Sequence, residues 1–209
     1  VTAQAVNTIE WLSASGTTIV VPVYQRQYRW DIGGCEKLLA DVRAVAASND
    51  AHTHFIGSIL SSESTAVTTG PDDVAELVLI DGQQRITTLM LLVAALHHTV
   101  RADNPVLAAE LERVLVRASD PHRTKLRPHR AWAEVFEKVV LEKTGEHEAR
   151  DSRFDDNYAF FRSQIRADEV AHIWRGLQKL EHVAITLGAD ANAQQIFESL
   201  NSTGLDLTQ

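Results

Sequence analysis

The stretch LVLIDGQQRITTLMLLVAAL at residues 77–96 decides the fold, because it joins two apolar segments through a short polar turn. Residues 77–80 form an apolar run of the kind that builds a buried strand. After Gln83 the apolar residues recur at helical spacing, and one face collects Ile86, Leu89, Met90, Val93 and Leu96. The Asp81-Gly82 pair lies between the two segments, where a sharp turn is expected. The stretch therefore predicts a strand that passes through a glycine turn into the first turn of a helix.

Such a junction has the properties of a phosphate site. The first amides of a helix have no partner within the helix, and the helix dipole places positive charge there. Arg85 is unfavourable in a first turn by the dipole argument, so its presence suggests that it grips phosphate oxygens. Asp81 is placed to hold Mg²⁺ or to orient a water molecule. The alternative is structural: Asp81 only caps the helix, while Gln83, Gln84 and Arg85 face solvent.

Patterns elsewhere predict a small sheet followed by helices. Strands are predicted at residues 17–24, where Pro22 ends the strand, and at 54–60, 76–80 and 182–188. Asp31 is a plausible cap for a helix that follows it, and the helix after Gln83 is expected to reach residue 102. Four further helical stripes follow, the last running from Val170 to Leu180, and Asp190 is expected to cap a final helix through residue 200.

The fold class is therefore predicted as α+β, with one domain over residues 1–209. Residues 1–104 are expected to form an α/β part, residues 105–181 a helical part, and residues 182–209 a returning strand and helix. The chain stops at GLDLTQ without an obvious final element, which predicts that it is cut from a longer protein.

Composition narrows the class of protein. The hydrophobic content of 44% and the charged content of 23% are typical of a globular domain. There is no apolar run long enough for a membrane helix and no signal-peptide pattern, and a single cysteine favours a reducing cytoplasm. The formal net charge of −8 argues against coating nucleic acid by bulk electrostatics. The scattered histidines lack acidic or cysteine partners at ligand spacing, so no structural metal site is predicted.

Positive charge is nevertheless concentrated in two places. YQRQYRW at residues 24–30 mixes aromatic and basic side chains, and TKLRPHR at residues 124–130 is strongly basic. Arginine, lysine and glutamine contact phosphates and base edges, whereas aromatic rings stack on bases. We expect Trp30 and Tyr28 to belong to the core. The DNA-binding set predicted from both segments is Pro22, Tyr24, Gln25, Arg26, Arg29, Lys125, Arg127 and Arg130. The alternative for the second segment is an ordinary solvated face.

Four blocks occur in order along the chain: VPVYQRQYRW, FIGSIL, LIDGQQRITTLMLL and FESLNSTGLDLT. Together they resemble the N-terminal domain of GmrSD-type modification-dependent restriction proteins, and within that family they resemble the phosphorothioate-sensing members. The resemblance implies a ParB/sulfiredoxin-like fold, hydrolysis of a nucleoside triphosphate (GTP favoured, with Mg²⁺), and sensing of modified double-stranded DNA. It also implies an HNH-type nuclease domain that would follow this chain in the full-length protein.

The resemblance also implies roles for particular residues. The DGQQR block would supply the nucleotide site, with Asp81, Gln84 and Arg85 as catalytic residues and Gly82, Gln83 and Arg85 as nucleotide-binding residues. Asn201, Thr203 and Gly204 of the LNSTG block would close that site from the other side. Tyr24, Gln25 and Arg26 would line the same cleft or the DNA face. Sulfiredoxins carry a reactive cysteine in the corresponding loop, but here Gln83 takes its place, which excludes that redox chemistry. Cys35 is expected to be a buried structural thiol.

Three functions remain open at this point. The first is a nucleotide-hydrolysing module that senses DNA modification and controls a linked nuclease. The second is a module that binds nucleotide or DNA without hydrolysis and acts as a clamp. The third is a domain that itself nicks DNA, with Asp81 and either Glu76 or Asp206 gathering a divalent metal. The third is disfavoured by the acidic balance of the chain and by the lack of a compact carboxylate motif.

Overall fold

The computed structural model describes residues 1–14, 16–25, 27–64, 75–142 and 152–202. A mixed sheet contains six strands: β1 (Thr2–Asn7), β2 (Thr17–Val20), β3 (His54–Glu63), β4 (Ala75–Asp81), β5 (Leu126–Arg127) and β6 (Leu180–Leu187). Their order across the sheet is β1-β6-β3-β4-β2-β5. The pairs β1/β6 and β3/β4 are antiparallel, whereas β6/β3, β4/β2 and β2/β5 are parallel. This mixture of sheet and helices agrees with the predicted α+β class.

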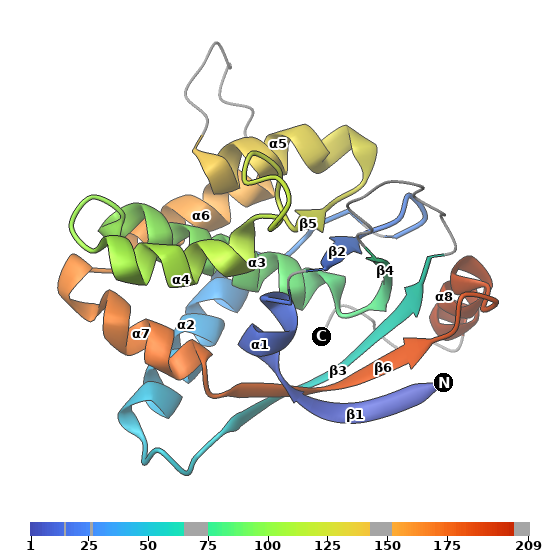
Figure 1. Cartoon of the computed structure of the whole chain (residues 1–209), viewed down its shortest axis with the longest axis horizontal. Coiled ribbons are helices and arrows are strands. Elements are labelled where there is room, and N and C mark those ends of the chain that lie inside the picture. Colours follow the sequence, from blue (N-terminus) through green and yellow to red (C-terminus); the bar gives the residue numbers. More distant parts are fainter. Residues whose placement is uncertain (15, 26, 65–74, 143–151, 203–209) are drawn as a thin grey trace.

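The helices in the described part of the chain are α1 (Thr8–Leu12), α2 (Ile32–Ala47), α3 (Gln83–Val100), α4 (Pro105–Leu115), α5 (Arg130–Leu141), α6 (Arg153–Gln164), α7 (Val170–Leu177) and α8 (Ala193–Ser202), with a 3₁₀ turn at Ala167–Glu169. Figure 1 shows α3 at the centre of the molecule, with α4 to α7 around it and α8 set apart from them. None of the helices in the described ranges is long and apolar enough to cross a bilayer.

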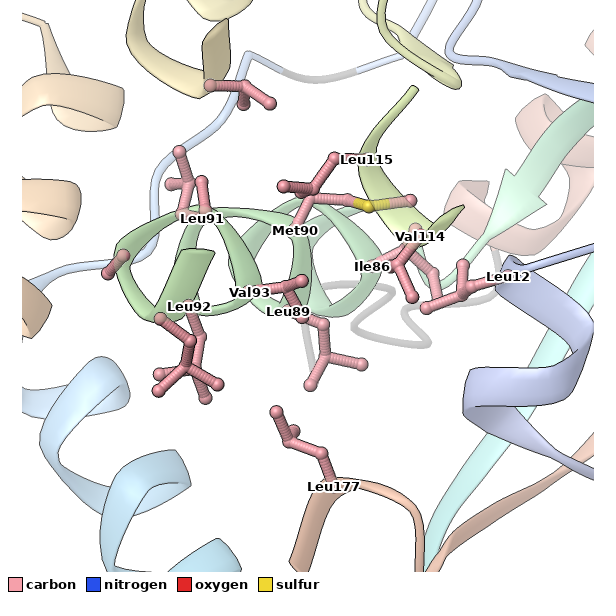
Figure 2. Packing of buried hydrophobic residues seen from close by; sticks show 14 of the residues in the cluster. Leu12, Ile86, Leu89, Met90, Leu91, Leu92, Val93, Val114, Leu115 and Leu177 are labelled. Carbon is pink, nitrogen blue, oxygen red and sulfur yellow. The ribbon is translucent and has the colours of Figure 1, made fainter. Parts of the chain in front are cut away.

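Helix α3 forms the centre of the core. Leu89, Leu91, Leu92 and Val93 are fully buried although they point in different directions around the helix. Figure 2 shows why: side chains from α1, α4 and α7 converge on α3, among them Leu12, Val114 and Leu177. A helix that is apolar all round must be covered on every side. The core therefore fixes the position of the residues at the N-terminus of α3.

Several element boundaries differ from the sequence-based prediction. The strand predicted in residues 17–24, with Pro22 as its end, stops two residues earlier at Val20, and a turn follows in which the Gln25 N–H donates to the Pro22 carbonyl over 3.1 Å. Proline lacks an N–H, so it cannot continue the ladder. Leu180, predicted as part of a helical stripe, begins β6 instead. The last helix is capped by Asn192 rather than Asp190, because the Asn192 Oδ1 accepts from the Gln195 N–H over 3.0 Å.

Strands β1 and β5 and the short helix α1 were not predicted. Strand β1 has an exposed, partly polar sequence, and β5 is only two residues long, so neither carries a clear periodic pattern. Their pairing partners lie far away in the sequence: β1 pairs with β6, and β5 pairs with β2. As a result, one sheet contains strands from each of the three parts predicted along the chain, residues 1–104, 105–181 and 182–209.

Candidate functional site

The turn between β4 and α3 has the geometry that the sequence predicts. Gly82 is the N-cap of α3 and adopts φ 95° and ψ 6°, a left-handed conformation that L side chains rarely adopt. A Cβ at this position would overlap the Cδ1 atom of buried Ile59. The N-cap residue is therefore Gly82 and not Asp81, which lies one position before it and accepts a hydrogen bond from the Gly82 N–H.

Asp81 and Arg85 form a half-buried pair of opposite charges beside this turn. Burial raises the pKa of the Asp81 carboxyl, whereas the Gly82 N–H and the positive charge of Arg85 act in the opposite direction. Burial also lowers the pKa of Arg85, and the negative charge of Asp81 opposes that change. Each charge is thus partly removed from water and partly compensated by the other.

The Arg85 side chain extends towards a bulge in β3. Its Nη1 donates to the Ile56 carbonyl, where the register of β3 with β6 shifts between Phe55 and Ser58. Gly57 in this bulge has φ 104°, and a Cβ there would lie 2.6 Å from the Arg85 Nη1. Glycine at this position therefore leaves the space that the guanidinium occupies.

The two glutamines of DGQQR are buried, each with 2% of its surface exposed. Gln84 has a structural role: its Oε1 accepts from the Arg29 N–H over 2.8 Å, and its Nε2 donates to the Gln27 carbonyl over 3.2 Å. The Oε1 of Gln83 has no hydrogen-bond partner among the residues the structure describes. The alternative in which these side chains face solvent is therefore wrong. To act as the predicted catalytic residue, Gln84 would have to release these two hydrogen bonds.

The YQR block is fastened to the end of β4. The Gln25 Nε2 donates to the carbonyls of Leu79 and Ile80 over 2.7 and 3.0 Å. Tyr24 lies against Phe197 of α8, with 5.5 Å between ring centroids. Tyr28 is buried, as predicted, and its hydroxyl bonds to the Thr88 hydroxyl over 2.7 Å. Arg26 lies outside the described residues.

Trp30 also matches its prediction, because it packs against the core although it is only partly buried. Arg29 is exposed, and only its backbone N–H is engaged by Gln84. Pro22 and Val23 form the outer part of the turn, and Val23 is 71% exposed. These residues leave an apolar tip at the surface.

A cavity of about 220 Å³ lies between the VPVYQRQYRW and LIDGQQRITTLMLL blocks, which are called the two motif blocks below. Three kinds of residue line it: apolar residues of the Val21–Val23 turn, glutamines from both blocks, and aromatic rings. The lining residues are Val21, Pro22, Val23, Gln25, Gln27, Tyr28, Gln83, Gln84, Thr87, Pro128, His129, Trp132 and Phe154. Trp132 and Phe154 were predicted only as core residues, since their helical spacing gives no sign that they also face a cavity.

A wider cleft of about 800 Å³ adjoins this cavity. The two share the walls Val21, Pro22, Val23, Pro128 and His129. The cleft also contains Arg123, Arg127 and Arg130. Arg123 pairs with Glu137 over 3.3 Å, and Arg127 pairs with Glu76 over 3.0 Å. Arg130 is exposed at the first residue of α5.

Lys125 does not belong to the DNA-binding set. It is 2% exposed, and its Nζ donates to the carbonyls of Ala14 and Arg113 over 3.0 and 3.1 Å. Burial lowers the pKa of its ammonium to about 8. The ammonium therefore joins neighbouring segments of the fold and has no surface to offer to a DNA phosphate. Its place in a basic run concealed this role.

The described part of the LNSTG block, residues 200–202, lies on α8, and its Leu200 packs beside β4. Helix α8 packs against β4, where Phe197 and Ile80 form a small second core. Asn201 is partly buried, and its Oδ1 has no hydrogen-bond partner within the described ranges. Thr203 and Gly204 lie outside those ranges. Cys35 is buried on α2, as predicted, and burial raises the pKa of its thiol to about 12.

The site thus combines a left-handed glycine turn, a half-buried Asp–Arg pair and a cavity lined by polar and aromatic side chains. No curated protein matches this chain. The family model described as "GmrSD restriction endonuclease, N-terminal domain" matches residues 9–209, which is nearly the whole chain. The match contains all four blocks quoted above, in their order along the chain. The chain therefore belongs to the family of N-terminal domains of GmrSD restriction endonucleases.

Proposed function

We propose that this domain senses modified DNA in the cleft and couples that event to hydrolysis of a nucleoside triphosphate, with GTP favoured, at the Asp81–Arg85 turn. Through this coupling it would control an HNH-type nuclease domain of the same full-length protein. One observation carries the proposal: the VPVYQRQYRW and LIDGQQRITTLMLL blocks share hydrogen bonds and line one cavity. A shift in the position of either block would move the other, because the side chains of Gln25 and Gln84 connect them directly by hydrogen bonds.

The cleft supports DNA as the partner. Arg127, Arg130 and the exposed Val23 all line it. Phosphate contacts position a duplex, and salt-bridged arginines can exchange a carboxylate for a phosphate. A phosphorothioate replaces a charged oxygen by a larger and softer sulfur. The apolar walls at Val21 and Pro22 suit such a group better than an ordinary phosphate, because less hydration is lost.

The Asp81–Arg85 pair supports nucleotide turnover. Mg²⁺ is commonly held by one or two carboxylates together with substrate phosphates, so the half-buried Asp81 carboxylate fits that requirement. A bound Mg²⁺ would neutralise charge that develops on the phosphates. Arg85 would stabilise the same charge once its guanidinium leaves the Ile56 carbonyl. The nicking alternative is weaker, since Glu76 is at the opposite end of β4, about 16 Å away, and is paired with Arg127.

The hydrolysis test uses this chain with GTP and Mg²⁺. Asp81→Asn keeps the shape of the side chain and removes its charge, and we expect it to lower the hydrolysis rate on the order of 100-fold. Phosphate release measures the rate. Asp103→Asn, an exposed acidic residue beyond the other end of α3, is the control and should hydrolyse GTP at the wild-type rate. Tight GTP binding without turnover in the wild-type chain would instead favour the clamp.

A second test concerns the cleft. Arg130→Gln removes an exposed charge at the N-terminus of α5, and we expect weaker binding to every duplex. The slope of the logarithm of affinity against the logarithm of salt concentration should decrease in magnitude by about 1. Fluorescence anisotropy over a range of salt concentrations measures this slope. Arg166→Gln, an exposed arginine before the 3₁₀ turn, should leave it unchanged. An unchanged slope in Arg130→Gln would show that DNA binds elsewhere.

A further inference from the structure

Two glutamines that line the cavity, Gln25 and Gln83, each carry a buried amide oxygen that the described residues do not satisfy. The amide of Gln25 has a fixed orientation, because its Nε2 donates to both Leu79 and Ile80. Its Oε1 is therefore an acceptor, and it is buried without a partner among the residues the structure describes. The Oε1 of Gln83 is likewise buried without a hydrogen-bond partner among the described residues. Buried acceptors without donors are unfavourable, so a ligand that brings N–H groups would relieve both.

The other walls of the cavity suit a flat ring. Tyr28 and Phe154 are stacked with 5.1 Å between centroids, and Trp132 meets Phe154 edge to face at 6.5 Å. These rings are held in place, since the Tyr28 hydroxyl also accepts from the Asn157 Nδ2 over 2.8 Å. Aromatic side chains are the usual surface on which single bases stack.

The size of the cavity limits the ligand. Its 220 Å³ is below the roughly 300 to 1,000 Å³ typical of pockets for drug-sized molecules. The space accommodates one ring system rather than a complete nucleoside triphosphate. A ligand that fills it must therefore leave its sugar and phosphates outside, in the adjoining cleft.

The entrance has the features needed to part a base from its stack. Val23 is 71% exposed at the tip of the Pro22–Gln25 turn, which forms a wall of both the cavity and the cleft. Exposed apolar side chains of this kind are inserted between base steps by proteins that unstack DNA. Arg130, the first residue of α5, lines the same cleft, where it can hold the displaced backbone.

We propose that this cavity receives one nucleobase turned out of the bound duplex, with Val23 entering the space that the base leaves. The N–H edge of the base faces Gln25 and Gln83, and its ring packs against Trp132 and Phe154. This inference rests on the DNA binding proposed above. The base of a free nucleotide carries the same chemical groups, so the test must distinguish a base of the duplex from that of a free nucleotide.

The test measures binding of this chain to short duplexes that contain one phosphorothioate linkage, by anisotropy of a terminal label. A mismatch is moved along the positions that flank the linkage. At the position of the extruded base we expect roughly tenfold tighter binding, because a mismatch removes part of the cost of unpairing. Trp132→Ala should weaken binding to the matched duplex roughly tenfold through lost stacking. It should have no effect when that base is replaced by an abasic site.

Val139→Ala is the matched control, since Val139 lies on the same helix and packs against the core without lining this cavity. Thermal unfolding of both variants shows whether the fold is intact, and Trp132→Phe restores stacking if Trp132→Ala is unstable. Equal affinities for matched, mismatched and abasic duplexes overturn this inference alone. Loss of GTP binding in Trp132→Ala with duplex binding intact assigns the cavity to a free nucleotide and also overturns it. If none of the duplexes binds, the proposed function fails as well.

Discussion

Replacement of Gly82 by alanine is expected to lower the free energy of unfolding by about 2 to 4 kcal/mol. Two effects add in this variant. Alanine would have to adopt φ 95°, and its Cβ would overlap the Cδ1 of Ile59, which is itself 1% exposed and cannot easily move. Chemical denaturation of the purified chain measures the change. We also expect GTP hydrolysis to fall, because the turn that positions Asp81 and Arg85 must distort.

The two effects can be separated. Ile59→Val removes the overlapping Cδ1, so Gly82→Ala should cost about 1 kcal/mol less in the Ile59→Val background than in the wild-type chain. Gly16→Ala provides the matched control, because a Cβ at Gly16 meets nothing within 4 Å, and its stability should stay within about 0.5 kcal/mol of wild type. If Gly82→Ala were as stable as Gly16→Ala, the left-handed turn described here would be wrong.

Much of the fold was predictable because its main elements carry strong local patterns. Residues 77–96 combine an apolar strand, a glycine and a helical period, and the structure forms β4, the turn and α3 at those positions. The elements that were missed depend on distant pairing. Strand β5 consists of Leu126 and Arg127 only, and its position is set by β2. No local pattern can indicate a partner more than 100 residues away along the chain.

The site was less predictable than the fold. The glycine turn followed from the residues themselves, since few other arrangements explain Asp-Gly between two buried segments. The roles of single polar side chains did not follow. Gln84 and Lys125 look like surface residues by type, yet each satisfies backbone groups of segments brought close only by folding. The residue type tells which hydrogen-bonding groups a side chain carries, whereas the tertiary structure decides which partners those groups meet.

Acid is expected to destabilise the domain strongly because two buried histidines must remain neutral. Burial lowers the pKa of His98 and of His182 to about 4, from an ordinary value of 6.5. The unfolded chain therefore binds more protons than the folded chain below pH 6.5, and stability falls as the pH falls. From about pH 7.5 to about pH 5 we expect a loss of about 2 kcal/mol for each histidine, or about 4 kcal/mol in total. Denaturation at a series of pH values measures this loss.

The hydrogen bonds of both histidines can be made by the neutral ring. The His98 Nε2 donates to the Val140 carbonyl over 2.8 Å, and its Nδ1 bonds to the Tyr158 hydroxyl over 2.6 Å. A hydroxyl can donate only to an unprotonated nitrogen, and neighbouring Arg101 further opposes a positive charge, although Glu142 favours one. The His182 Nδ1 bonds to the Thr8 hydroxyl over 2.8 Å, and the charge of Arg85 opposes its protonation.

The contribution of His182 links acid stability to the site. His182→Gln removes one of the two titrating groups, so the loss between about pH 7.5 and about pH 5 should shrink by about 2 kcal/mol. His52→Gln, at an exposed loop histidine, should leave the loss unchanged. Arg85→Met removes the positive charge that opposes protonation of His182, so the folded chain should take up that proton at higher pH and lose less stability in acid. An identical pH dependence in wild type, His182→Gln and Arg85→Met would contradict a buried neutral histidine beside Arg85.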